Sequence, residues 1–222
     1  MLDKYKQLLK IYDKMLDFTG PRNWWPGETP FEVVVGAILT QSVAWRNVEK
    51  AINNLKSAGL LDIDALYQAD TEEIAGHIIP TLYYRMKASK LKAFVTLLVE
   101  KYGSSLEQMF DQDLRQLRQE LLAVYGIGPE TADSIILYAA EKPVFVVDAY
   151  TKRIFHRLGI FPADIDYAGM QEFFMTHLDA DVQLYNEYHA QIVGIGNRFC
   201  GNRKPACDRC PLNELCRFAK EK

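Results

Sequence analysis

The sequence predicts an all-α protein. Apolar residues recur at three- and four-residue spacing along most of its 222 residues, which is the period of an amphipathic helix. The one strand-like run, residues 144–147, is four residues long and has no partner run, so we interpret it as a buried extended connector. Hydrophobic residues make up 49% of the chain and charged residues 25%, an ordinary globular composition that excludes a disordered or fibrous protein.

Nine segments carry the helical pattern. They are residues 2–18, 31–40, 45–58, 86–102, 114–124, 131–140, 149–158, 167–178 and 182–193. Glycine or proline separates most of them, but no break has the composition of a flexible linker, so we expect two interleaved helical lobes. No apolar run reaches the about 18 residues that cross a bilayer, and the N-terminus lacks an apolar signal-peptide core. We therefore expect a cytoplasmic protein that binds no membrane.

Basic residues are concentrated in three parts of a chain whose net charge is −3. Residues 198–222 hold seven basic and three acidic side chains, residues 85–101 five and one, and residues 142–157 four and one. Such clustering on an acidic whole predicts contact with a polyanion through one face. The alternative is that the helices simply carry solvated lysine and arginine.

The four cysteines fall close together near the C-terminus, at Cys200, Cys207, Cys210 and Cys216. Thiolates this close in sequence usually share a metal. Zinc sites generally use two C-x2-C pairs, whereas only Cys207 and Cys210 form such a pair here. Four thiolates can equally hold an iron–sulfur cluster. Spacing alone leaves zinc, a cluster or neither open.

The pattern over residues 121–137 predicts a helix, a tight turn and a second helix. Gly126 and Gly128 in the turn are expected to adopt backbone angles that a Cβ would obstruct, and Pro129 suits the first position of the second helix. Such a turn directs backbone N–H groups outward beside a positive helix terminus, which makes a phosphate site. A plain helix–helix corner with glycine at its C-cap is the alternative.

Asp148 directly follows the buried run 144–147 and precedes the helix 149–158. An aspartate in that place most often caps the helix. A carboxylate at the end of a buried run can also lie in a cleft with its ionisation tuned for catalysis. The residues alone leave both roles open.

In chain order, the turn at residues 126–128, the run 144–147 with Asp148, and the cysteine pattern together resemble the helix-hairpin-helix DNA glycosylases of the endonuclease III type. The resemblance covers essentially the whole chain, because residues 30–32 (Pro-Phe-Glu) and 38–41 (Ile-Leu-Thr-Gln) match as well. It implies two helical lobes with a DNA cleft between them, and damaged double-stranded DNA as the partner of a monomeric enzyme. It also implies a [4Fe–4S] cluster on the four cysteines, and it makes Asp148 the catalytic carboxylate.

The resemblance further implies how the chain is divided. One six-helix lobe comprises residues 30–140, with the helix-hairpin-helix motif at about residues 113–140. The other comprises residues 1–29 and 141–222, with Asp148 and the cluster loop 200–216. Gln41, together with Tyr83 or its neighbour Leu82, would fill the gap left by a flipped base. The implied DNA contacts are Gly126, Ile127, Gly128, Thr131, Gln41, Tyr83 and Lys152.

Two sequence features bear on the reaction. Glu130 stands where endonuclease III has the lysine that forms a Schiff base, and a carboxylate cannot form an imine, so we expect a monofunctional glycosylase. The segments Asn23-Trp-Trp-Pro26 and Glu130-Thr-Ala-Asp133 resemble the 3-methyladenine glycosylases of the superfamily, although members of that branch can lack the iron–sulfur loop. The implied base pocket is Trp24, Trp25 and Glu130, with tryptophan rings that stack on a cationic alkylated purine such as 3-methyladenine.

Two other functions stay open. A bifunctional glycosylase and lyase for oxidised pyrimidines would use another lysine, such as Lys152, as its nucleophile. A catalytically silent DNA-binding module would keep the hairpin and the cluster, although the intact Asp148 argues against it. Ordinary packing also remains the alternative role of the two tryptophans.

Overall fold

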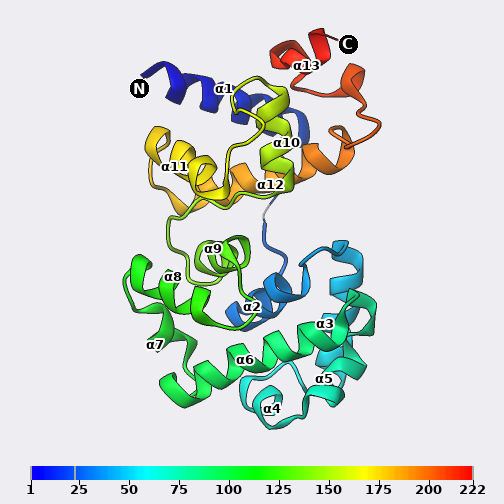
Figure 1. Ribbon diagram of the computed structural model, residues 1–222, viewed down its shortest axis with the longest axis vertical. Coiled ribbons are helices and arrows are strands. Elements are labelled where there is room, and N and C mark those ends of the chain that lie inside the picture. Colours follow the sequence, from blue (N-terminus) through cyan, green and yellow to red (C-terminus); the bar gives the residue numbers. More distant parts are fainter. Residues whose placement is uncertain (1, 23, 222) are drawn as a thin grey trace. The chain divides into compact units, whose positions relative to one another are not determined.

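The computed structural model describes residues 2–22 and 24–221. Within these residues all regular secondary structure is helical, which confirms the predicted all-α class. The chain forms two compact units, which are Met1–Trp25 with Pro143–Lys222 (unit 1) and Pro26–Lys142 (unit 2). Figure 1 labels their helices. The lobe expected at residues 30–140 lies within unit 2.

Unit 2 is built around two largely buried helices, α2 (Pro30–Leu39) and α9 (Pro129–Tyr138). All side chains of α2 from Phe31 to Leu39 are buried, as expected of a helix that lies in the core. The helix starts where the Thr29 side chain accepts a hydrogen bond of 3.1 Å from the Glu32 N–H, a typical N-terminal cap. The other elements of unit 2 are α3 (Trp45–Ser57), α4 (Ile63–Gln68), α5 (Thr71–His77), the 3₁₀ turn η1 (Ile79–Thr81), α6 (Tyr84–Tyr102), α7 (Leu106–Phe110) and α8 (Leu114–Ala123).

Helix α6, with 19 residues, crosses the whole of unit 2 in Figure 1. It packs against α4, α5 and α2, while α9 packs against α2 and α8. Gln41, in the loop after α2, donates a hydrogen bond to the carbonyl of Gly126, in the turn between α8 and α9. It also accepts a hydrogen bond from Lys90 on α6. The loop after α2, the first turns of α6 and the turn between α8 and α9 therefore lie side by side.

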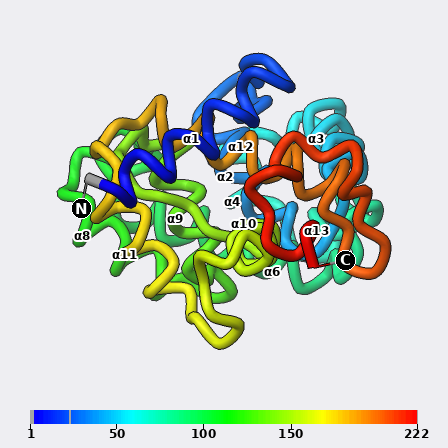
Figure 2. The backbone as a smooth tube through the Cα atoms, turned by 90° about the horizontal axis from the view of Figure 1, so that it is seen from above, coloured from blue at the N-terminus to red at the C-terminus, as the bar shows by residue number. Residues whose placement is uncertain are grey.

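Unit 1 combines both ends of the chain around a core of aromatic side chains. Helix α12 (Val182–Arg198) packs against α1 (Leu2–Thr19) and α10 (Ala149–Arg157), and α11 (Tyr167–His177) contacts α1. Phe145 stacks on Phe174 with ring centres 4.0 Å apart, and both rings meet Tyr188 edge-on. The C-terminal segment, orange and red in Figure 2, holds η2 (Cys207–Arg209), η3 (Asn213–Leu215) and α13 (Arg217–Lys220).

The nine predicted helices are all present, and residues 144–147 form a buried connector that is neither helix nor strand. The sequence pattern missed α4, α5, α7 and α13, because their four to seven residues are too few to display a period. The usable signal was the capping side chain that starts three of them, namely Asp62, Asp70 and Ser105. No helix among the described residues is long and apolar enough to span a membrane.

Candidate functional site

The turn between α8 and α9 contains one glycine that the backbone requires. Gly126 has φ +78°, and a Cβ there would collide with the side chain of Lys90. The expectation was wrong for Gly128, whose φ of −93° and ψ of 178° are open to any residue. A Cβ at Gly128 would meet nothing within 4 Å. Gly128 is the N-cap of α9.

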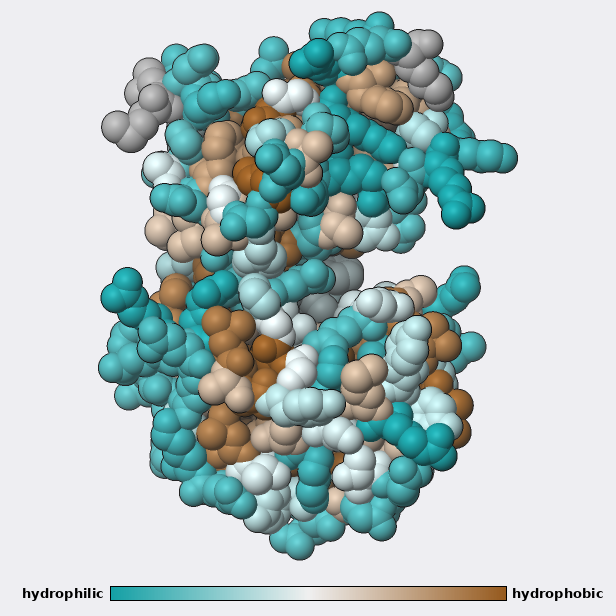
Figure 3. All heavy atoms as spheres, in the orientation of Figure 1, coloured by the Kyte–Doolittle hydropathy of each residue, from teal (hydrophilic) through white to brown (hydrophobic). Residues whose placement is uncertain are grey.

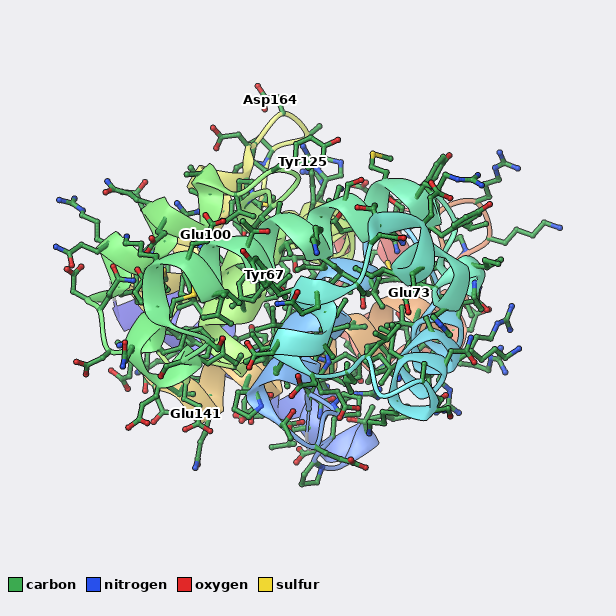
Figure 4. The ribbon with its side chains drawn as sticks, turned by 90° about the horizontal axis from the view of Figure 1, so that it is seen from below. Tyr67, Glu73, Glu100, Tyr125, Glu141 and Asp164 are labelled. Carbon is green, nitrogen blue, oxygen red and sulfur yellow. The ribbon has the colours of Figure 1, made fainter. Side chains whose placement is uncertain are left out.

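The hairpin turn presents backbone donors beside the N-terminus of α9. The Ile127 N–H bonds the Val124 carbonyl at 3.1 Å, and the first bond of α9 runs from the Ala132 N–H to the Gly128 carbonyl. Because the first N–H groups of a helix have no partner within it, they can bind an anion there. The Ile127 side chain is buried and its N–H is bonded within the turn, so the donors that remain for an anion are those at the start of α9. Tyr125, labelled in Figure 4, is 61% exposed.

An ion pair fixes the two helices of the hairpin to each other. Arg118 on α8 donates to both oxygens of Asp133 on α9, with Nε–Oδ1 at 2.7 Å and Nη2–Oδ2 at 3.1 Å. The Asp133 carboxylate is fully buried. A bidentate arginine–carboxylate pair restricts orientation as well as distance, so the turn is carried by a rigid helix pair.

Gln41 and Thr131, both expected to contact DNA, bond to each other in this structure. The Gln41 Nε2 donates to Thr131 Oγ1 at 2.9 Å and to the Gly126 carbonyl at 3.1 Å, and its Oε1 accepts from Lys90 Nζ. Thr131 itself is buried. The Gln41 amide therefore links the loop after α2 to the hairpin.

A second loop carries exposed apolar side chains. Leu82 is 56% exposed and Tyr83 68%, and both have left-handed backbone angles. Ile79 and Met86 beside them are also exposed. Figure 3 shows that apolar residues, in brown, occur at the surface of unit 2 beside hydrophilic ones in teal. Exposed apolar side chains on a loop are the type that can enter a base stack.

Asp148 is the N-cap of α10 and has a second oxygen in a different environment. Its Oδ1 accepts hydrogen bonds from the N–H and the hydroxyl of Thr151, at 2.7 and 2.8 Å. Its Oδ2 lies 3.8 Å from Nε2 of His189 on α12. Burial lowers the pKa of His189, against the opposing effect of the Asp148 charge, so the imidazole is neutral at pH 7. The sequence analysis missed His189, because only the packing of α10 on α12 brings it to Asp148.

Lys152, on the same helix as Asp148, has its ammonium directed to a carbonyl. Its Nζ donates to the Ile165 carbonyl at 2.8 Å. A lysine that acts as a nucleophile needs a free amine that can reach the reacting carbon. The hydrogen bond gives Lys152 a positional role within unit 1.

Trp24 and Trp25 pack edge-to-face, with ring centres 5.3 Å apart, and both are half-buried. Asn23, from the same sequence motif, lies outside the described residues. Pro26, the next residue in the chain, lines a hollow of about 380 Å³ in unit 2. Further residues around this hollow are Glu28, Glu32, Trp45, Glu49 and Lys56.

The hollow has an aromatic wall and an excess of negative charge. Lys56 bridges Glu28 at 2.8 Å and Glu32 at 3.0 Å, so three carboxylates face one ammonium around it. Trp45, the first residue of α3, is the aromatic member that sequence analysis missed. A single tryptophan at a helix start carries no pattern, and only the fold places it around one hollow with Pro26 and Glu28.

All four cysteines line one hollow in unit 1. Among the described residues, no three His, Cys, Asp or Glu side chains gather as ligands of a single metal ion. Burial, together with the neighbouring cysteines, raises the pKa of Cys210 to about 11, so a positive group must be present for it to ionise. Four thiolates around one hollow are a ligand set that fits an iron–sulfur cluster.

Two arginines of α10 hold the cysteine loop. Arg157 donates to the Cys200 sulfur at 3.1 Å and to the carbonyls of Gly201 and Asn202. Arg153 donates to the Cys200 carbonyl at 2.7 Å. Hydrogen bonds from cationic groups stabilise thiolate sulfur, so these contacts also suit a negatively charged cluster site.

Comparison with known proteins defines the class. Residues 35–179 match the model of the HhH-GPD superfamily base excision DNA repair proteins, and residues 203–216 match the iron-sulfur binding domain of endonuclease III. The chain therefore belongs to the HhH-GPD superfamily, as a DNA glycosylase of base-excision repair with a [4Fe–4S] domain at its C-terminal loop.

Individual relatives refine this assignment. A Methanocaldococcus jannaschii protein that carries the name of a DNA repair glycosylase, MJ1434, is 46% identical over 215 residues, or 96% of this chain and 97% of the relative. The crystal structure of an H. pylori 3-methyladenine DNA glycosylase bound to 1,N6-ethenoadenine has a TM-score of 0.75 at 27% identity, over 88% and 97% of the chains. A non-covalent endonuclease III–DNA complex has a TM-score of 0.84 at 23% identity, over 98% and 97%, which confirms the endonuclease III-like fold.

Proposed function

We propose that this glycosylase is monofunctional and removes alkylated purines such as 3-methyladenine from double-stranded DNA. The observation that carries the proposal is the combination of Asp148, with one carboxylate oxygen turned from its cap toward His189, and Glu130 in the hairpin. A carboxylate is present to assist hydrolysis, and the position of the Schiff-base lysine has no amine.

The chemistry follows from the charge that develops on the sugar. A base within a duplex must be flipped out before its glycosidic bond can be reached. As the C1′–N bond breaks, its electron pair leaves with the base and positive charge builds on the sugar. Asp148 stabilises that charge and accepts the proton of the water that bonds to C1′. A cationic alkylated base leaves as a neutral molecule, so no separate general acid is required.

Two groups of residues, one in each unit, have the chemistry to attract a cationic base. Trp24 and Trp25 in unit 1 supply electron-rich rings, and the hollow in unit 2 has Trp45 in its wall. Glu28, Glu32 and Glu49 around this hollow outnumber Lys56. Aromatic faces and carboxylates both attract positive charge, and normal purines are uncharged. The name of the H. pylori relative, a 3-methyladenine glycosylase, supports the same substrate class.

We further propose that Cys200, Cys207, Cys210 and Cys216 hold the cluster, which when bound cross-links the C-terminal loop. The purified protein should then be yellow-brown and contain about four iron and four sulfide per chain. Metal and acid-labile sulfide analysis, with the visible absorption spectrum, checks this. Stoichiometric zinc without visible absorption would contradict it.

The substrate proposal is tested on a panel of duplexes that differ in one base. We expect single-turnover release of 3-methyladenine, with strand breaks that appear only after alkali treatment. Borohydride should trap no covalent complex on abasic DNA, because hydrolysis forms no imine. Release of oxidised pyrimidines with trapping would instead assign a bifunctional enzyme, and Lys152→Ala would then show whether that lysine is the nucleophile. Binding without excision of any base would assign a silent module.

A further inference from the structure

Among the loops of unit 2 that have non-glycine residues in left-handed conformations are the loop after α2 and the loop before α6. Ser42, in the loop after α2, has φ +58°, and Leu82 and Tyr83, before α6, have φ +54° and +46°. Such angles are unfavourable for residues with a Cβ and persist only where the surrounding structure holds them. Leu82 and Tyr83 are also exposed, so their own side chains contribute little to holding that backbone.

Lys87 on α6 connects the bases of these two loops. Its Nζ donates to the carbonyl of Leu39 at 2.8 Å and to the carbonyl of Thr81 at 2.6 Å. Leu39 is the last residue of α2, and Thr81 directly precedes Leu82. One ammonium group therefore fixes the end of α2 and the end of η1 at a set distance from each other.

A buried cation at this point costs free energy, which indicates that its two hydrogen bonds are needed there. Lys87 is only 2% exposed, and burial, with the nearby charge of Lys90, lowers its pKa to about 8. A buried ammonium is unfavourable unless its donors are bonded. An apolar side chain would fill the same space without that cost, but it could not bond two carbonyls.

We propose that Lys87 is a positioning residue for base extrusion, which sets the spacing of the two loops that enter the duplex. This inference rests on the proposed function, in which Gln41 and either Tyr83 or Leu82 occupy the gap left by the flipped nucleotide. Both loops must reach the same gap, so an error in their spacing reduces the population of extruded base. It leaves the hydrolysis at Asp148 untouched.

Helix α6 offers a matched control in Lys92. Its Nζ also bonds two backbone carbonyls, those of Tyr67 and Ala69, the latter at 2.7 Å. Tyr67 is on α4 and is labelled in Figure 4. Lys92→Met therefore removes an equivalent pair of bonds from the same helix without acting on either DNA-entering loop.

The test compares single-turnover excision by Lys87→Met and Lys92→Met, in the full chain with its cluster. The lesion is placed either in a base pair or opposite an abasic site, where extrusion is easier. Lys87→Met should lose on the order of tenfold on the paired lesion, as expected for the loss of bonds from a charged donor, and little on the unpaired one. Lys92→Met should change both rates by the same factor. An equal loss on both substrates by Lys87→Met, or no loss, would overturn the proposal.

Two additions keep the result interpretable. If Lys87→Met does not fold, Lys87→Arg retains the cation but shifts the two carbonyls. The same contrast between the paired and the unpaired lesion is then expected, but smaller.

If the wild type excises no alkylated base, the proposed function fails. The fluorescence of 2-aminopurine in a base pair with thymine then tests the loops without excision, and an equal signal from Lys87→Met and wild type would refute the positioning role.

Discussion

Asp148→Asn is expected to reduce the single-turnover rate of excision by a factor on the order of 10²–10⁴, the usual range for loss of a catalytic carboxylate. The amide is neutral, so it neither stabilises positive charge on the sugar nor accepts a proton from water. Binding to damaged duplex should survive or tighten slightly, because one negative charge near the phosphates is removed. Rapid-quench excision and equilibrium binding on the same duplex measure the two effects.

The competing explanation is that Asp148 serves only as a helix cap. Its Oδ1 accepts two hydrogen bonds from Thr151, and loss of a cap costs about 0.5–2 kcal/mol of stability. Asparagine caps equally well, so the melting temperature of Asp148→Asn should change little. Asp181→Asn at the N-cap of α12, where Oδ1 accepts from the Leu184 N–H, is the matched control and should leave excision intact. A folded Asp148→Asn that excises at the wild-type rate would remove Asp148 from the mechanism.

How much of the fold and of the site can be predicted from the sequence depends on how far apart in the chain the interacting residues are. The helical period is local, and it was sufficient for the all-α class. The cysteine spacing is local as well, but it indicated a cluster only together with the resemblance to the endonuclease III type. His189 and Lys87 could not be found that way. Each acquires its role from a residue distant in sequence, Asp148 and Leu39 respectively, and such contacts exist only once helices have packed.

The hairpin shows the same limit within a single motif. The sequence placed the turn correctly, but it assigned the same reason to both glycines. Only Gly126 has the left-handed angle and the crowded Cβ position, because the Lys90 side chain lies across it. That crowding depends on α6, more than 30 residues earlier in the chain, so local turn chemistry could not distinguish Gly126 from Gly128.

Because Gly128 tolerates a side chain and Gly126 does not, Gly128→Asp can test the phosphate site without a steric effect on the turn. A Cβ is accommodated at Gly128, and aspartate is a favourable N-cap, so thermal stability should be unchanged or slightly higher. The new carboxylate would accept the N–H groups at the start of α9 and repel a DNA phosphate. Loss of charge-assisted bonds of about 1.5–3 kcal/mol corresponds to an increase in Kd on the order of 10–100-fold.

Two further substitutions at the same position separate the causes of that weaker binding. Gly128→Ala adds only a methyl group and should bind abasic-analogue duplex nearly as well as wild type. Gly128→Asn occupies the same N–H groups without charge, so its Kd should lie between those of Gly128→Ala and Gly128→Asp. The salt dependence of binding should also be shallower for Gly128→Asp, by about one unit of log–log slope for each phosphate that the turn no longer binds. If all three variants bind with wild-type affinity and wild-type salt dependence, the turn between α8 and α9 is a structural corner and the phosphates are bound elsewhere.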